Sequence, residues 1–276
     1  MAGRITLPRI IITGASDGIG AELARQLAHT HRSQAQLVLA ARNVANLESV
    51  ALQCRAAQAQ VWVIPTDVSD ATQCRALIAQ SVQVLGGLDA LINNAGVSAH
   101  ALLADVQTEH LAWYEELMRV NLWGTIWCTH AALPHLQATH GRIVGVASLA
   151  GLVGVPGRTA YSASKFAMAG FLEALRAELK PSGVSVTTAY PGVVDTRIRY
   201  HGYNAKGQAA GVSALKEEGA MPVAECARLI VNGMERRQRE VVMTPQAKIG
   251  RFLKLIAPGW VENMALAAVK AEDQPH

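Results

Sequence analysis

Short and almost continuous apolar runs alternate along this chain with longer stretches of helical periodicity. Strands that are apolar on both faces are typical of a parallel sheet covered by helices on both sides. The pattern therefore predicts an α/β fold, a doubly wound Rossmann-type sheet of seven parallel strands with helices on both faces. We expect the strands at residues 9–13, 35–41, 60–65, 88–94, 142–148, 184–190 and 240–244.

The order of these elements predicts a single Rossmann-fold domain over residues 1–276, with no internal repeat and no linker. A first helix is expected from Gly18 to about His31, and a long helical stretch at about 108–138. The irregular, Gly-rich stretch near 193–220 follows a strand, where such sheets bind ligands, so we expect a mobile substrate lid there. Residues near 245–276 form a C-terminal extension.

Composition and charge exclude several classes of protein. Half of the residues are hydrophobic, yet no apolar run reaches the roughly eighteen residues of a membrane span. The N-terminus lacks the pattern of a signal peptide, so a cytoplasmic protein is the expectation. The net charge of +4 comes from dispersed basic residues, which predicts no nucleic-acid partner.

Cysteine and histidine spacing predicts no metal site and no disulfide framework. The four cysteines contain no CxxC pair and are expected to be buried free thiols. His130, His135 and His140 do not share one helix face, so they are poorly placed to bind a metal ion together.

A glycine-rich turn, TGASDGIG, lies between the first predicted strand and the first predicted helix at residues 13–20. Glycines let the backbone turn tightly and approach a ligand closely. The N–H groups and the positive dipole end of the following helix suit a pyrophosphate. This context, a strand before the turn and a helix after it, indicates a dinucleotide-binding loop.

The motifs of the chain, taken in their order, resemble the short-chain dehydrogenase/reductase family. The matching residues are Thr13, Gly14, Gly18, Ile19 and Gly20; Asn93, Asn94, Ala95 and Gly96; Asn121, Ser148, Tyr161 and Lys165; and Pro191, Gly192 and Thr196. The resemblance implies reversible hydride transfer between a nicotinamide cofactor and an alcohol/carbonyl substrate, with Asn121, Ser148, Tyr161 and Lys165 as the catalytic set. It implies a cofactor-binding set of Gly14, Ser16, Gly18, Ile19, Gly20, Arg42, Asp67, Val68, Asn94, Ala95, Gly96, Tyr161, Lys165, Pro191, Gly192, Val194 and Thr196.

Tyr161 and Lys165 stand four residues apart and can therefore address one pocket from one helix face. A free tyrosine has a pKa of about 10 and is a poor base at neutral pH, but a nearby cation favours the phenolate. Lys165 can supply that charge, and Ser148, at a strand end, can orient the substrate oxygen. The resemblance implies that Asn121 holds a water that links Lys165 to solvent.

The residues at the end of the second strand favour NADP over NAD. NAD-preferring relatives place an acidic residue there, whereas this chain has Ala41, followed by Arg42 whose planar fork suits a 2′-phosphate. Asp17 stands in the glycine turn where many NADP users carry a basic residue. Its carboxylate could instead cap the helix that begins at Gly18.

Several alternatives remain open at this level. A 3-oxoacyl thioester reductase and a non-catalytic NADP-binding protein would share the fold, whereas sugar-nucleotide epimerases differ in glycine spacing and length. The C-terminal extension is similar to the tails of reductases acting on lipophilic carbonyls. It mixes apolar and basic residues, so it could touch a membrane surface, although a cover for the pocket or a subunit contact is the favoured interpretation.

The helices at about 108–138 and 159–180 are expected to form the interface of a homodimer or homotetramer. Trp123 and Trp127 share a face on the first, and the second offers a face of small and apolar residues. Family members usually pair through these two helices.

Overall fold

The computed structural model describes residues 8–211 and 219–270, and it contains the predicted sheet of seven parallel strands. The strand order is β3-β2-β1-β4-β5-β6-β7, so the chain runs from β1 to one edge and then returns to fill the other side. All seven predicted strands are confirmed, with ends shifted by no more than two residues. They are β1 (Arg9–Thr13), β2 (Gln36–Ala41), β3 (Gln60–Pro65), β4 (Ala90–Asn93), β5 (Arg142–Val146), β6 (Ser185–Tyr190) and β7 (Glu240–Val242).

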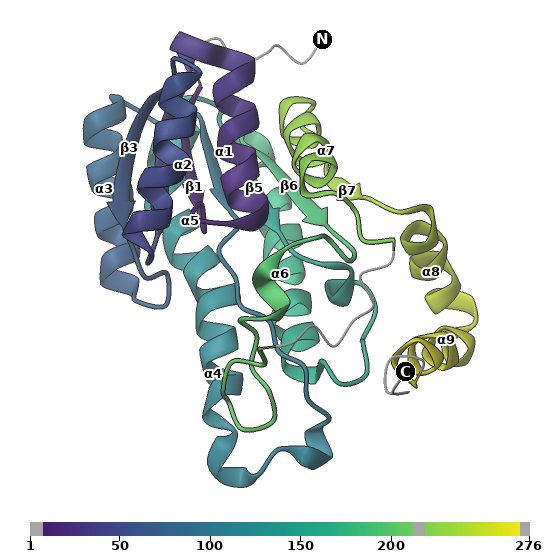
Figure 1. Cartoon of the computed structure of the whole chain (residues 1–276). Coiled ribbons are helices and arrows are strands. Elements are labelled where there is room, and N and C mark those ends of the chain that lie inside the picture. The colour runs from purple at the N-terminus through teal and green to yellow at the C-terminus, as the bar shows by residue number, and fades with distance from the viewer. Residues whose placement is uncertain (1–7, 212–218, 271–276) are drawn as a thin grey trace.

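Helices cover both faces of the sheet, as Figure 1 shows. One core cluster packs α1, α2 and α7 against one face, and a second packs α3, α5 and α6 against the other. The helices are α1 (Gly18–His31), α2 (Val44–Ala56), α3 (Ala71–Leu85), α4 (Ala112–Met118), α5 (Gly124–Ala138), α6 (Thr159–Glu178), α7 (Val223–Glu235), α8 (Pro245–Ile256) and α9 (Pro258–Lys270). Short 3₁₀ turns lie at Arg32–Gln34, Leu103–Asp105, Thr108–His110, Leu149–Gly151, Lys180–Ser182 and Arg197–Arg199.

Polar residues fix where the helices on the first half of the sheet begin. Asp17, Asn43 and Asp70 are the N-cap residues of α1, α2 and α3, and each carboxylate or amide oxygen accepts a backbone N–H of the first turn. The backbone N–H groups of Gln73 and Thr72 lower the pKa of the Asp70 carboxyl, because they stabilise its charged form.

The long helical stretch predicted at 108–138 is interrupted. A 3₁₀ turn leads into α4, and a π-helical turn at Arg119–Trp123 separates α4 from α5. Asn121 lies inside the π turn, where its side-chain amide exchanges two hydrogen bonds with the backbone of Val97, at 2.9 and 3.0 Å. A wide turn of this kind is common at functional sites, and here it turns a polar side chain inward toward the end of β4.

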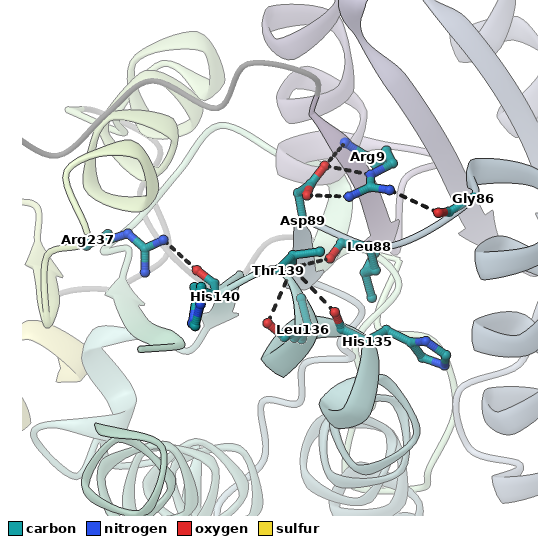
Figure 2. Close-up of polar contacts among 9 residues, drawn as sticks. All are labelled: Arg9, Gly86, Leu88, Asp89, His135, Leu136, Thr139, His140 and Arg237. Carbon is teal, nitrogen blue, oxygen red and sulfur yellow. Dashed lines mark hydrogen bonds and ion pairs between the residues drawn. The ribbon is translucent and has the colours of Figure 1, made fainter. Parts of the chain in front are cut away.

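The amino-terminal edge of the sheet is fastened by polar contacts (Figure 2). The Arg9 guanidinium donates to both carboxylate oxygens of Asp89 at 2.9 Å and to the carbonyl of Gly86 at 3.0 Å. The Thr139 hydroxyl donates to the carbonyl of Leu88 at 2.7 Å. These contacts join the start of β1, the residues before β4 and the C-terminal ends of α3 and α5 at the edge opposite the carboxyl ends of the strands.

The four cysteines are buried and free, as expected. Among the residues that the structure describes, no group of three or more His, Cys, Asp or Glu side chains could hold a metal ion. Within the same part of the chain, no helix is long and apolar enough to cross a membrane.

Candidate active site

The sheet brings the predicted site residues to one edge. The glycine turn follows β1, Arg42 follows β2, Asp67 and Val68 follow β3, Asn94–Gly96 follow β4, Ser148 follows β5 and Pro191–Thr196 follow β6. Because all the strands are parallel, every one of these turns lies at the same carboxyl edge. Figure 1 shows the segments that follow β4 and β6 lying together below the sheet, beside the start of α6.

The turn after β4 holds the glycine turn in place. The Asn94 side-chain amide donates to the carbonyls of Thr13 and Gly14, at 3.0 and 3.1 Å. The Thr13 hydroxyl accepts the backbone N–H groups of Asn94 and Ala95, at 3.0 and 3.1 Å. Asn94, predicted as a cofactor residue, therefore uses its amide to shape the loop.

Gly14 is required by this close approach. Its φ of +65° lies in the left-handed region, and a Cβ atom there would stand only 2.7 Å from the Cα of Ala95. Any other L-residue would therefore push the two turns apart.

The residues present fit the phosphates of a dinucleotide. Residues 16–19 are accessible to solvent at the N-terminus of α1, where backbone N–H groups and the helix dipole favour an anion. Thr196, from the turn after β6, stands opposite them, since a Cβ on Gly18 would lie 3.3 Å from its methyl group. Arg42 is exposed directly after β2, which ends at Ala41 as predicted. The Asp17 carboxylate accepts the N–H of Gly18 at 2.7 Å, so the prediction that it caps α1 is confirmed.

Tyr161 and Lys165 lie on one face of α6, and both are almost completely buried, at 6% and 3% exposure. The Lys165 Nζ atom donates to the carbonyl of Val146, the last residue of β5, at 2.9 Å and lies 5.8 Å from the centre of the Tyr161 ring. Burial lowers the pKa of the Lys165 ammonium, and the nearby Arg158 lowers it further, whereas Tyr161 acts in the opposite direction. The sheet and the helix thus confine a cation beside a phenol with little water.

Ser148 is placed by the 3₁₀ turn that follows β5. Its hydroxyl oxygen accepts the N–H of Ala150 at 3.2 Å. A serine hydroxyl has one hydrogen to donate, and this contact uses only an acceptor lone pair. The hydroxyl hydrogen therefore remains available for a substrate oxygen.

Asn121 is completely buried and reaches toward the same helix. Besides its bonds to Val97, its amide donates to the hydroxyl of Ser164 at 2.9 Å, and that hydroxyl donates to the carbonyl of Tyr161 at 2.8 Å. A Cβ on Gly96 would lie 3.1 Å from Asn121 Oδ1 and 3.4 Å from Lys165 Nζ, so these groups surround one glycine. The predicted water relay through Asn121 stays a prediction.

Three residues that no sequence motif singled out, Ser98, Arg158 and Ser164, also lie at this site. Ser164 links Asn121 to the backbone of Tyr161, as described above. The guanidinium carbon of Arg158 lies 4.3 Å from the centre of the Tyr161 ring. The same guanidinium donates a hydrogen bond to the hydroxyl of Ser98 at 2.5 Å. A sequence signal for Arg158 did exist, because a basic residue just before a helix opposes the helix dipole.

Isolated backbone bridges connect the segment predicted as a lid to neighbouring parts of the protein. The isolated bridge between Ala99 and Tyr203 joins its middle to the segment after β4, and the bridge between Val194 and Met221 closes its base. Residues 212–218 of the lid lie outside the described residues. Its mobility stays a prediction.

The C-terminal extension forms α8 and α9 beside the site (Figure 1). The Lys254 ammonium donates to the carbonyl of Leu152 at 2.9 Å and lies 4.6 Å from the centre of the Phe166 ring. Leu152 belongs to the segment that follows Ser148, so α8 borders the site from the β7 side. The two helices expose large apolar side chains, namely Ile249, Phe252, Leu255, Ile256, Trp260, Met264 and Leu266.

Comparison with known proteins agrees with this geometry. The family model described as short chain dehydrogenase matches residues 8–205. The 11-beta-hydroxysteroid dehydrogenase-like protein 4A of Arabidopsis thaliana is 36% identical over 250 residues, which cover 90% of this chain and 80% of that one. Dehydrogenase/reductase SDR family member 7B of Mus musculus is 30% identical over 256 residues, or 91% of this chain and 77% of that one.

Solved structures similar to this chain are also dehydrogenases. A short-chain dehydrogenase/reductase from Burkholderia phymatum in complex with NAD shares 26% identity at a TM-score of 0.76, covering 91% of this chain and 94% of that one. An alcohol dehydrogenase from Thermococcus sibiricus complexed with 5-hydroxy-NADP shares 26% identity at a TM-score of 0.66, covering 79% and 86%. The chain belongs to the short-chain dehydrogenase family and is an oxidoreductase of that family.

Burial of Lys165 predicts a pH-dependent cost in stability. The folded protein binds the lysine proton more weakly than the unfolded chain does, so the cost is full below the lowered folded pKa, falls as the pH rises above it, and disappears past the unfolded pKa of about 10.4. Lys165→Met should therefore melt at the same or a higher temperature at pH 7, by about 2 °C for each kcal/mol gained. The gain should shrink as the pH approaches about 10.

The exposed Lys180 gives the control, since Lys180→Met should leave the melting temperature unchanged at either pH. A Lys165→Met protein that melts well below the wild type at pH 7 would show that the bond to Val146 outweighs the cost of burying the charge.

Proposed function

We propose that the protein is an NADP-dependent oxidoreductase that interconverts an alcohol and a carbonyl on a lipophilic small molecule. The observation that carries this proposal is the grouping of Ser148, Tyr161 and Lys165 at the carboxyl edge, beside a glycine turn that fits a dinucleotide. A protein that only bound the cofactor would have no need of Ser148, Tyr161 and Lys165 together.

Each of these residues has a task that follows from its contacts. The Ser148 hydroxyl, fixed through Ala150, donates to the substrate oxygen and orients it. Tyr161 exchanges a proton with that oxygen, and the Lys165 charge stabilises the phenolate that forms. A bound nicotinamide supplies or accepts the hydride. Asn121 holds the backbone around Val97 and, through Ser164, the carbonyl of Tyr161.

The surroundings of Tyr161 support a lipophilic substrate. Tyr161 belongs to an apolar cluster that includes Ala99, Trp113 and Leu117. The segments after β4 and β6, which pair beside it, expose large apolar side chains: Leu102, Leu103, Val193, Ile198 and Tyr200. Several relatives are named for 11-beta-hydroxysteroids, which are lipophilic alcohols.

Three observations support NADP as the cofactor. No carboxylate stands at the end of β2, where Ala41 is found. Arg42 is exposed directly after it, where a guanidinium can pair with a 2′-phosphate. Asp17, the residue that argued against NADP, turns its carboxylate to the N–H of Gly18.

We also propose a homo-oligomer formed through α4, α5 and α6, and a cytoplasmic location. Trp123 is 47% exposed and stacks on Trp127 with ring centres 5.8 Å apart. It lines a groove between the helices together with Tyr114, Met118, Ala160 and Ala163, and the charged Glu115 and Arg119 complete the lining. Four free cysteines are consistent with a reducing compartment, and cell fractionation would test the location.

The proposed reaction is tested with a panel of steroid, retinoid, aliphatic and 3-oxoacyl thioester carbonyls, followed by nicotinamide absorbance. On the substrate that turns over, Tyr161→Phe should reduce kcat by at least about 10²–10⁴-fold, because the proton donor is lost. The variant should keep its cofactor affinity and melting temperature. Near-normal turnover by Tyr161→Phe would contradict the mechanism, and preference for the thioesters would correct the substrate class.

The choice of cofactor is tested with Arg42→Ala. A charged hydrogen bond contributes roughly 1.5–3 kcal/mol, so NADP should bind about 10–150-fold more weakly while NAD is barely affected. The measurement is the dissociation constant of each cofactor by titration calorimetry. Arg228→Ala on α7, another exposed arginine, is the control and should change neither constant. Equal losses for both cofactors in Arg42→Ala, or tighter NAD binding by the wild type, would refute the assignment.

The oligomer is tested with Trp123→Arg, which places a charge in the proposed apolar contact. We expect a dimer or tetramer for the wild type and a monomer for the variant in sedimentation at micromolar concentration. Leu52→Arg, at an exposed apolar residue of α2, should leave the assembly intact. A monomeric wild type would exclude the interface.

A further inference from the structure

Arg158 occupies a position where elementary electrostatics disfavours it. It is the N-cap residue of α6, a helix of twenty residues, and its side chain makes no capping hydrogen bond. Cations are destabilising near a helix N-terminus, because the dipole is positive there, and the preferred cap residues are small and polar. A different contact must therefore account for an arginine at this position.

The first such contact joins the helix to the segment after β4. The Arg158 Nη2 atom donates to the hydroxyl of Ser98 at 2.5 Å, and Nε donates to the carbonyl of Ala99 at 3.4 Å. Ser98 is buried, at 3% exposure, so the guanidinium is anchored inside the protein. A backbone hydrogen bond joins the same two segments, because the N–H of Ala101 donates to the carbonyl of Gly157 at 2.7 Å.

The second contact is with the proposed proton donor. The guanidinium carbon of Arg158 lies 4.3 Å from the centre of the Tyr161 ring, closer than the Lys165 ammonium at 5.8 Å. Two basic side chains thus lie near one phenol ring, Arg158 from the N-cap of α6 and Lys165 from within the helix. A guanidinium over an aromatic face is attracted to it and restricts the plane of the ring.

Other charged or titratable groups near the ring come from neighbouring elements. The Tyr114 hydroxyl of α4 pairs with the hydroxyl of Thr159 at 2.7 Å, and the His100 ring faces Gly157. Burial and a hydrogen bond to Glu116 raise the pKa of Tyr203 to about 12, so Tyr203 stays neutral at physiological pH. Among these described neighbours, Arg158 and Lys165 are the basic groups beside the ring, and the guanidinium of Arg158 is the one whose charge burial does not remove.

We propose that Arg158 is a positioning residue of the active site: it fixes the plane of the Tyr161 ring and, together with Lys165, stabilises negative charge on the phenol oxygen. The inference rests on the proposed role of Tyr161 as the proton donor. If Arg158 only linked α6 to Ser98, its charge would not affect the ionisation of Tyr161; the proposal is that it does.

Two substitutions separate charge from linkage. Arg158→Lys keeps the positive charge but loses the fork that reaches Ser98 and Ala99, whereas Arg158→Gln can still donate hydrogen bonds but is neutral. We expect Arg158→Gln to reduce kcat by about 5–30-fold with little change in KM, and Arg158→Lys to retain most of the rate. Cofactor affinity and melting temperature report on folding, and Arg228→Gln is the surface control.

A readout that does not depend on activity keeps this inference distinct from the proposed function. The alkaline titration of tyrosinate absorbance is measured for each protein, and subtraction of the Tyr161→Phe curve isolates the ionisation of Tyr161. In Arg158→Gln this transition should move to higher pH, because a positive charge that favours the phenolate is lost, and in Arg158→Lys it should move less. The acid limb of the pH profile of alcohol oxidation should move in the same direction, because the phenolate is the proton acceptor.

Ser98→Ala is a second test, since it removes the hydroxyl that accepts the hydrogen bond of Arg158 but does not change the arginine itself. We expect a smaller upward move of the tyrosinate transition, because the guanidinium is no longer held over the ring; this variant also serves if Arg158→Gln does not fold. An unchanged transition in the folded variants, or a glutamine variant as active as the lysine variant, would overturn the inference. If the wild type turns over no substrate but the transition is shifted in Arg158→Gln, the proposed function is refuted and the electrostatic effect of Arg158 on Tyr161 stands.

Discussion

The site depends on one tie between two turns that are far apart in the sequence. The amide of Asn94 donates to the carbonyls of Thr13 and Gly14, and the hydroxyl of Thr13 accepts two N–H groups in return. Each of these groups would otherwise be a partly buried polar group without a partner, which is costly. The glycine turn, and hence the N-terminus of α1, is therefore held at a fixed distance from the end of β4.

The two edges of the sheet carry different groups: a structural ion pair at the amino edge and the candidate active site at the carboxyl edge. The amino edge is fastened by the pair of Arg9 and Asp89, whose fork geometry adds direction to the charge attraction (Figure 2). Each edge also buries a cation whose pKa is lowered by burial: Arg142, the first residue of β5, at the amino edge, and Lys165 at the carboxyl edge. Only Lys165 lies close to Tyr161, where the proposed reaction uses its charge.

Much of the fold was predictable because its signals are local. Apolar runs and helical periodicity depend on residues close in the chain, so all seven strands and the start of α1 at Gly18 were found. The site residues were predicted from the resemblance of their motifs to the family, and the topology explains why they meet: the turns after parallel strands share one edge, which brings Gly18, Ser148 and Thr196 to the same side of the sheet. The interruption of the helix at Asn121 was not predicted, because the π turn is accompanied by hydrogen bonds to Val97, which lies 24 residues away in the sequence.

The sequence by itself determined which residues could do chemistry, since Tyr161 and Lys165 share a face whenever that segment is helical. Only the tertiary structure decided what surrounds them. The hydrogen bond from Arg158 to Ser98 spans 60 positions, and the bond from Asn121 to Ser164 spans 43. Contacts of this kind depend on how β4, the π turn and α6 pack together, and no local pattern carries that information. The same packing decides that Asn94 shapes the glycine turn and that a second cation stands over the Tyr161 ring.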